Sequence, residues 1–362
     1  MKRSDLIYTR PEELAATQPA EARGISRDEA RLMVSDEQGN THAGFRDLPE
    51  FLNAGDVLVV NDSATLPASL PAKAETLGEF IVNLSTCYGN GVWLVEPRWS
   101  SAQPGPLPLT EGAVIQVGGV ETRLLHRFPG LPRLWFVRFA DETLLNTAIG
   151  RFGQPIRYGY VQQAHPLSVY QTVFSRVPGR AEMPSAAYPF TERLVERLRR
   201  KGVEIASITL HTGVSSLEVE TEIVEQHPLY PEPFSVSRAT ADAVNAARAE
   251  GRRVIAVGTT VVRALETAWD GWQVLPRSGF TRIYIHPQRG AYVADGLITG
   301  LHDPVTSHLA MLYAITKQGI ILSAYEEAVQ RGYLWHEFGD SHLILGCAAC
   351  RQQERLAALQ AA

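Results

Sequence analysis

Residues 254–266 read Val-Ile-Ala-Val-Gly-Thr-Thr-Val-Val-Arg-Ala-Leu-Glu, and the rest of the chain can be interpreted around them. The run 254–257 is short and apolar, with β-branched residues, which predicts a buried strand. Gly258 permits a tight turn, and Thr259 and Thr260 can cap a helix that begins immediately. A strand, turn and helix in this order place backbone N–H groups at a helix N-terminus, which favours a polar or anionic ligand.

Arg263 and Glu266 lie one turn further along this helix. They are three residues apart, so they share a face and can either pair with each other or reach a ligand. An ordinary strand-to-helix turn with a surface ion pair is the alternative interpretation. The stretch by itself does not distinguish the two.

Composition limits the class of protein. The chain has 362 residues, 45% of them hydrophobic and 20% charged, which predicts a soluble globular protein of two domains. Because no apolar run approaches membrane-spanning length and the N-terminal residues are polar, we expect a cytoplasmic protein with no membrane partner. The formal net charge of −5 argues against wholesale binding of a phosphate backbone but allows a local basic patch.

The three cysteines are too few for a disulfide framework. Cys347 and Cys350 lack the second pair that a structural zinc site needs, and only Cys87 remains. We therefore expect no metal site and treat the pair as structurally neutral, with a redox or metal role as the alternative.

Strands and helices alternate on both sides of a middle region of different texture. Strands are predicted at 32–34, 57–60, 205–210, 254–257 and 282–286. Helices are predicted after Thr191, after Ser237, after Gly258 and over 307–316, and a short one over 45–52. This alternation predicts an α/β fold with a mainly parallel sheet covered by helices.

The middle region, residues 71–150, contains short β-rich runs separated by hairpin turns such as Asn90-Gly91 and Gly118-Gly119. It has no convincing helix before 142–149. Closely spaced strands of this kind predict a small antiparallel barrel. We therefore expect an inserted barrel domain at 71–150 and a discontinuous α/β domain formed by 1–70 and 151–362.

Polar residues follow three of the predicted strands. They are Asn61-Asp62, His211-Thr212 and Thr259-Thr260. Three such strand ends are better explained by one shared pocket than by chance, although an Asx turn is the alternative for Asn61-Asp62.

The order of short motifs along nearly the whole chain resembles a known family, the S-adenosylmethionine:tRNA ribosyltransferase-isomerases of the queuosine pathway. The matching pieces are Val60-Asn61-Asp62 with Pro67-Ala68, Tyr170-Gln171-Thr172-Val173, Phe190-Thr191, Thr209-Leu210-His211 with Gly213, His227 with Glu232, 256–260 with Arg263 and Leu265-Glu266, Asp295, His302 with Pro304, and Phe338-Gly339-Asp340. The resemblance implies an α/β domain interrupted by a Greek-key barrel. It also implies transfer of the ribosyl part of S-adenosylmethionine to the aminomethyl group of a 7-deazaguanine in the tRNA anticodon, with release of adenine and methionine and formation of an epoxide.

The chain also departs from the family pattern. The family's segment after Asn-Asp usually carries an arginine and ends Pro-Ala-Arg, whereas this chain has Ser69 at the last position. Its Ala-Pro-Thr-Ala-Gly-Leu-His-Phe-Thr corresponds here to 183–191, which lacks the histidine. The loop after Gly213 reads Val-Ser-Ser-Leu rather than Gly-Thr-Phe. These differences identify a divergent member.

The implied reaction needs a base that removes a proton from the carbon next to the sulfonium. By residue type His211 and His302 are the candidates. Asp62, Asp295 or Asp340 can orient one of these histidines or stabilise the sulfonium electrostatically. The residues expected to bind S-adenosylmethionine are Asn61, Thr191, Gly213, Gly258, Thr259, Thr260, Arg263 and Glu266. Arg263 would hold the methionine carboxylate and Glu266 a ribose hydroxyl.

Two functions of different class remain open. The first is a ribosyltransferase-isomerase with S-adenosylmethionine as co-substrate, tRNA as partner and a monomeric state. The second is a paralogue that binds S-adenosylmethionine but uses another acceptor, or that only binds or regulates because the family's arginine and histidine are missing. The net charge of −5 disfavours tRNA as the acceptor, because RNA binding depends on cationic side chains.

Overall fold

Strand β14 (Val254–Val257) lies in the interior of a nine-stranded sheet. The computed structural model describes residues 1–214 and 218–346, and orders this sheet β15-β13-β12-β3-β14-β16-β17-β1-β2. The four central strands, β12 (Glu204–Leu210), β3 (Val57–Asn61), β14 and β16 (Gly296–Gly300), are mutually parallel. Pairing of Val254 with Val57 confirms the prediction that these two apolar runs share one sheet.

Antiparallel pairs flank this parallel centre. One edge carries β13 (Glu232–Val236) and β15 (Arg277–Thr281), and the other carries β17 (Ser341–Leu345), β1 (Arg31–Asp36) and β2 (Gly39–Gly44). Strand β17 is antiparallel to β16 but parallel to β1. The fold class is thus confirmed, as a large mixed sheet whose centre is parallel.

One predicted strand is wrong. Residues 282–286 do not form a strand, and the edge strand is β15, which immediately precedes them. Four of the five residues of β15 are exposed, so this strand carries no apolar pattern. Ile283 and Ile285, which suggested a strand, instead pack into the core from outside the sheet. The strands β13, β16 and β17 and the helix α6 (Gln318–Gln330) were not predicted.

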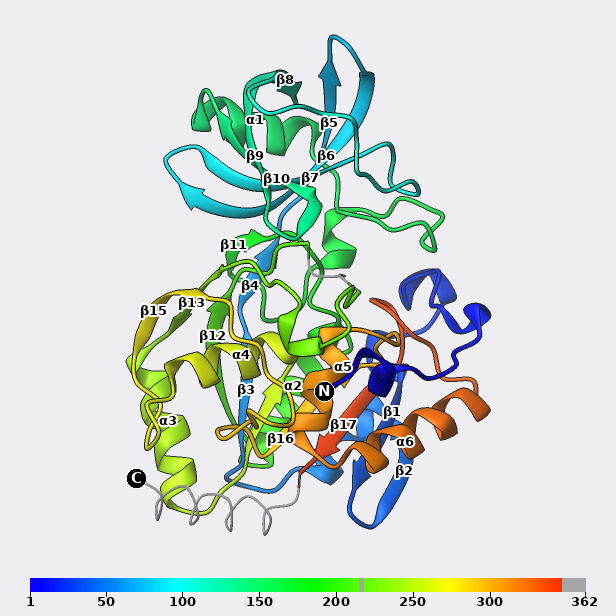
Figure 1. Cartoon of the computed structure of the whole chain (residues 1–362). Helices are drawn as coiled ribbons and strands as arrows, with labels where there is room; N and C mark the ends of the chain where they lie inside the picture. The colour runs from blue at the N-terminus through cyan, green and yellow to red at the C-terminus, as the bar shows by residue number, and fades with distance from the viewer. Residues whose placement is uncertain (215–217, 347–362) are drawn as a thin grey trace.

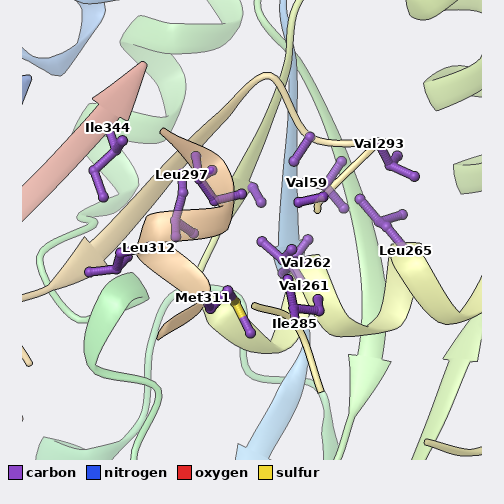
Figure 2. Packing of buried hydrophobic residues seen from close by; sticks show 14 of the residues in the cluster. Val59, Val261, Val262, Leu265, Ile285, Val293, Leu297, Met311, Leu312 and Ile344 are labelled. Carbon is purple, nitrogen blue, oxygen red and sulfur yellow. The ribbon is translucent and has the colours of Figure 1, made fainter. Parts of the chain in front are cut away.

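Alternating side chains of the central strands form the two layers of the core. Val57 and Val59 face one cluster, whereas Leu58 and Val60 face the other. The first cluster is covered by α3 (Arg238–Ala249), α4 (Thr259–Ala268), α5 (Ser307–Ile315) and α6, and part of it is shown in Figure 2. The second is covered by α2 (Glu192–Arg200) and the 3₁₀ helix Phe45–Phe51. Burial on both faces explains why residues 57–60 of β3 and 254–257 of β14 are continuously apolar.

Six strands form a closed barrel, which Figure 1 shows above the large sheet. They are β5 (Ser69–Ala74), β6 (Gly78–Gly89), β7 (Val92–Arg98), β8 (Val114–Val117), β9 (Val120–Phe128) and β10 (Leu131–Phe139). The order β10-β7-β6-β5-β8-β9 returns β8 to the side of β5, which is the Greek-key arrangement. Asn90 and Gly91, with φ of 52° and 73°, form the predicted turn between β6 and β7.

The barrel strands extend from Ser69 to Phe139. Helix α1 (Glu142–Phe152) packs on the barrel, and the barrel core includes residues from Ala68 to Ile156. Between the barrel and the large sheet, β4 (Ser63–Thr65) pairs in parallel with β11 (Val177–Arg180) (Figure 1). The division into 71–150 and two flanking segments stays a prediction.

Short 3₁₀ helices complete the described chain. Besides Phe45–Phe51 they are Arg3–Leu6, Glu12–Leu14, Glu21–Arg23, Arg27–Glu29, Leu167–Tyr170, Ser185–Ala187 and Val224–Gln226. Across 1–214 and 218–346, none of the helices combines the length and the apolar character needed to span a membrane.

Candidate active site

A cavity of about 260 Å³ opens at the carboxyl ends of β3, β14 and β16. In the sheet, β12 lies beside β3 on one side, and β16 lies beside β14 on the other side. Ligands of α/β sheets bind at such a switch point, where the connections from two neighbouring strands lead to opposite sides. The polar residues that line this active-site cavity are Asn61, Tyr160, Arg180, Glu182, Ser185, Thr212, Glu218, Thr259, Thr260, Thr299, His302, Asp303, Thr306, His308, His336 and Glu337.

Residues 257–260, from the stretch quoted at the start of the sequence analysis, form one wall of the cavity. Gly258 has φ of 95° and its N–H donates to the carbonyl of Ile298 at 2.8 Å. Helix α4 begins at Thr259, so Gly258 is its N-cap and the predicted capping by the threonines is wrong. Gly258 provides no side-chain cap for α4. Thr259 and Thr260 of its first turn line the cavity, at the positive end of the helix dipole.

Asn61 lies at the end of β3 and is 3% exposed. Its Nδ2 donates to the Leu210 carbonyl at 2.9 Å and to Thr260 Oγ1 at 3.2 Å. Its Oδ1 accepts from the N–H groups of Ser63 at 3.1 Å and Leu210 at 3.0 Å. The amide has thereby used all four of its hydrogen bonds. We infer that Asn61 positions the strand ends around the cavity.

His302 is the predicted base that the structure places in the cavity. Its Nε2 is 2.7 Å from Thr299 Oγ1, and its ring stacks on that of His308 with centroids 4.9 Å apart. Burial, together with the neighbouring histidines His308, His342 and His336, holds the pKa of His302 well below its ordinary value. His302 is therefore neutral at neutral pH and can accept a proton or a hydrogen bond.

Glu337 is an acid–base candidate that the sequence analysis missed. Burial, reinforced by Glu182 and Asp303, raises the pKa of its carboxyl to about 7, while the hydroxyl of Tyr160, which donates to Oε2 at 2.5 Å, opposes the rise. A carboxyl that titrates near neutral pH suits general acid–base catalysis. The only sequence signal was its position beside Phe338 in a matching motif, because burial of a glutamate cannot be seen in one sequence.

Arg180 was also missed, and it brings a cation to the cavity. Its side chain is 3% exposed, and burial lowers its pKa to about 10, so it stays charged at neutral pH. Nε donates to the Glu182 carbonyl at 2.7 Å and Nη2 to Thr212 Oγ1 at 2.8 Å. Nη1 has no hydrogen-bond partner among the described residues. A buried donor of this kind can bind a carboxylate that enters the cavity.

His211 and Asp62 lie beside the cavity but are absent from its lining. His211 Nδ1 is 2.7 Å from Ser63 Oγ, and Asp62 Oδ1 accepts from Thr209 Oγ1 at 2.6 Å. Burial and the charge of Arg180 lower the pKa of His211, and Asp62 opposes this. The three predicted catalytic residues are thus divided, with His302 on the cavity and the other two behind it.

Arg263 contacts neither the active-site cavity nor Glu266. It forms a buried ion pair with Glu232, whose Oε1 accepts from the Gly213 N–H at 2.8 Å. Arg263 lines a separate cavity of about 50 Å³, and His308 lines both cavities. Gly213 is likewise outside the larger cavity. Arg263 and Gly213 therefore lie outside the lining of the active-site cavity, and both are joined to Glu232 next to it.

Glu266 holds a neighbouring loop. Its buried carboxylate accepts from the N–H groups of Tyr292 at 2.6 Å and Val293 at 2.8 Å, and pairs with Arg289 at 3.1 Å. The alternative in which Arg263 and Glu266 form a surface pair is therefore wrong, whereas contact of either residue with a ligand stays a prediction. Partners distant in sequence decide the contacts of these two residues.

Thr191 is not brought to the cavity. Its Oγ1 accepts from the Leu194 N–H at 3.2 Å as the N-cap of α2, and donates to Asp28 at 3.1 Å. This capping role was predicted from the sequence, whereas a contact with S-adenosylmethionine has no geometric support.

Within 1–214 and 218–346, no cluster of three or more His, Cys, Asp or Glu residues is arranged to hold a metal ion. Cys87 is a free, exposed cysteine. Cys347 and Cys350 lie outside the described residues, as do three of the residues after Val214 that depart from the family pattern.

A cavity at the switch point of an α/β sheet, with a buried guanidinium and a carboxyl that titrates near neutral pH, is typical of an enzyme that binds a small charged substrate. The chain belongs to the family described as queuosine biosynthesis protein, whose model matches residues 3–344.

The names of similar proteins are consistent with this family. An S-adenosylmethionine:tRNA ribosyltransferase-isomerase of Anaeromyxobacter dehalogenans is 36% identical over 352 residues, covering 95% of this chain and 99% of the relative. One from Thermus thermophilus is 38% identical over 337 residues, covering 88% and 93%. A crystal structure of S-adenosylmethionine tRNA ribosyltransferase from Thermotoga maritima, 28% identical, matches with a TM-score of 0.52 over 94% of this chain and 100% of that one.

Proposed function

We propose that the chain transfers and isomerises the ribosyl moiety of S-adenosylmethionine onto 7-aminomethyl-7-deazaguanine in the tRNA anticodon, giving epoxyqueuosine. The family match and the names of the relatives support this activity. The observation that carries it here is Glu337, a carboxyl with a pKa of about 7 on a cavity at the switch point of the sheet.

Glu337 is the proposed base. The positive sulfur of S-adenosylmethionine acidifies the adjacent carbon, because it stabilises the carbanion formed there. A carboxylate with a pKa near 7 is a stronger base than an ordinary glutamate, and about half of it is ionised at neutral pH. Once protonated, it can return a proton to the departing adenine. Neutral His302, fixed by Thr299, would accept or donate a hydrogen bond beside it.

The charges of the cavity fit S-adenosylmethionine. The carboxylates of Glu182 and Asp303 lie on its lining with Glu337, and they favour the sulfonium and the ammonium group of the methionine moiety. Arg180 would bind the methionine carboxylate through Nη1. The first turn of α4 would receive polar groups of the nucleoside. Asn61, Gly213, Arg263 and Glu266 would hold the surrounding backbone.

The test is to mix the protein with S-adenosylmethionine and an anticodon stem-loop RNA that carries the 7-deazaguanine. Chromatography should detect adenine, and mass spectrometry should detect the epoxide in the RNA. The same RNA with guanine at that position is the control. Calorimetric binding of S-adenosylmethionine without adenine release would instead support the non-catalytic paralogue. We expect a monomeric cytoplasmic enzyme with tRNA as its partner.

A further inference from the structure

A second and larger cavity, of about 780 Å³, lies between the outer face of the barrel and the segment that returns the chain to the large sheet. We call it the barrel groove. Its walls come from β5, β6 and β8, from the loop after β7, and from residues 152–170. The proposed reaction with S-adenosylmethionine makes no use of it.

Aromatic rings line the barrel groove. Trp99 is 37% exposed and Phe152 is 41% exposed, whereas Phe80 and Tyr170, which also line the groove, are buried. Trp99 follows β7 and Phe152 ends α1, so two elements far apart in sequence bring large rings to one cavity. Exposed rings in a cavity are the surfaces on which unpaired nucleobases stack.

Charged and polar groups in the barrel groove suit the remaining parts of a nucleotide. Lys73 and Arg157 line it together with a single acid, Glu79, so its formal charge is positive on a chain of net charge −5. His165 also lines it, and its Nε2 is buried without a hydrogen-bond partner among the described residues. Cations can contact phosphates, and an unpaired ring nitrogen can bond the edge of a base.

The segment 154–165 connects the barrel groove with the active-site cavity. Arg157 lines the groove, whereas Tyr160, three residues later, lines the active-site cavity and donates to Glu337. Tyr158 stacks on Tyr160 with centroids 6.1 Å apart. A nucleotide in the groove and a reacting base in the cavity would therefore lie on two sides of one segment.

From these observations we infer that the barrel groove binds an unpaired nucleotide of the RNA substrate, next to the reacting base, by stacking it on Trp99 and Phe152. This inference rests on the proposed function for the identity of the RNA. It assigns RNA recognition to the barrel and S-adenosylmethionine binding to the large sheet.

The test is Trp99→Ala, measured by fluorescence anisotropy with a labelled anticodon stem-loop RNA. Loss of one stacked base should weaken RNA binding about fivefold to a hundredfold. Trp99→Phe should retain most of the affinity because it keeps a ring. S-adenosylmethionine affinity and melting temperature should not change. Trp272→Ala is the matched control, because Trp272 is 68% exposed and does not line the groove.

A second pair of measurements separates stacking from charge. Phe152→Ala should weaken RNA binding as Trp99→Ala does, with the same salt dependence as the wild type. Lys73→Gln should instead reduce the salt slope of RNA binding by about 1. Unchanged RNA affinity in both aromatic variants would overturn the inference.

Failure of the inference can be told from failure of the proposed function. If the wild type releases adenine and the aromatic variants bind RNA normally, only the groove assignment is wrong. If the wild type releases no adenine but Trp99→Ala still weakens RNA binding, the groove assignment is supported and the proposed reaction is wrong.

Discussion

Replacing Glu337 by glutamine should change how the stability of the protein depends on pH. Burial raises the pKa of this carboxyl from 4.5 to about 7 in the folded protein. Because the folded state binds the proton more tightly than the unfolded state, protonation stabilises the fold. This stabilisation is complete below about pH 4.5 and is lost as the pH rises through about 7. The full shift of the pKa corresponds to about 3 kcal/mol of stability. This value is an upper limit, because the carboxyl partly faces the cavity, where solvent screens its interactions.

The assay is urea unfolding of the wild type and Glu337→Gln at about pH 5 and about pH 8. Glutamine mimics the protonated carboxyl and can accept the same hydrogen bond from Tyr160. The wild type should therefore lose up to about 3 kcal/mol more than the variant between the two pH values. Equal losses would refute the reasoning. Tyr160→Phe is the companion variant, because removing its hydrogen bond should raise the pKa of Glu337 and shift the loss to higher pH.

Ligand binding gives a second readout of the same carboxyl. The sulfonium of S-adenosylmethionine favours ionised Glu337, so affinity in the wild type should rise as the pH increases through about 7. The variant should show a flatter profile and no adenine release. A wild-type affinity that is independent of pH would place the sulfonium away from Glu337.

The other predictions concern residues around the cavity. Arg263→Ala should destabilise the fold by about 3–5 kcal/mol in urea unfolding, because it leaves Glu232 buried without its cation; a change of only a few tenths would contradict the buried pair. Arg180→Met should weaken S-adenosylmethionine binding about tenfold to a hundredfold in calorimetry and cost about 1–3 kcal/mol of stability, because the Glu182 carbonyl and Thr212 lose a buried donor; unchanged affinity would remove Arg180 from the carboxylate site. Gly213→Ala should destabilise by about 1–3 kcal/mol, because its Cβ would lie 2.2 Å from Ser85 Oγ, and the added Ser85→Gly should recover part of this loss if the clash is the cause.

The centre of the fold could be predicted because its residues carry their own pattern. Residues 57–60 and 254–257 are continuously apolar, as is typical of strands buried on both faces, and they pair as expected. The barrel was predictable from glycine-bearing turns. The edge strand β15 was not, since four of its five residues are exposed and a strand at the rim needs no apolar alternation.

The candidate site was harder to predict, because its polar residues are selected by tertiary contacts. Sequence spacing placed Arg263 and Glu266 on one helix face, yet each found a partner at another position, Glu232 and Arg289 respectively. Glu337 carries no local signal of its raised pKa, which depends on burial and on carboxylates brought together by the fold. Strand ends, by contrast, follow from topology alone, so Asn61 and Thr260 were predicted correctly as part of the cavity lining.

The departures from the family pattern bear differently on the two cavities. Ser69, where the family usually has an arginine, lines the barrel groove and not the active-site cavity. Pro189, at the position of the missing histidine, is buried and outside the lining of the active-site cavity. Neither change removes Arg180 or Glu337 from that cavity. A carboxyl that titrates near neutral pH can both attract the sulfonium and exchange a proton, and the second property is the one that an acid–base catalyst requires, so Glu337 agrees with an enzyme.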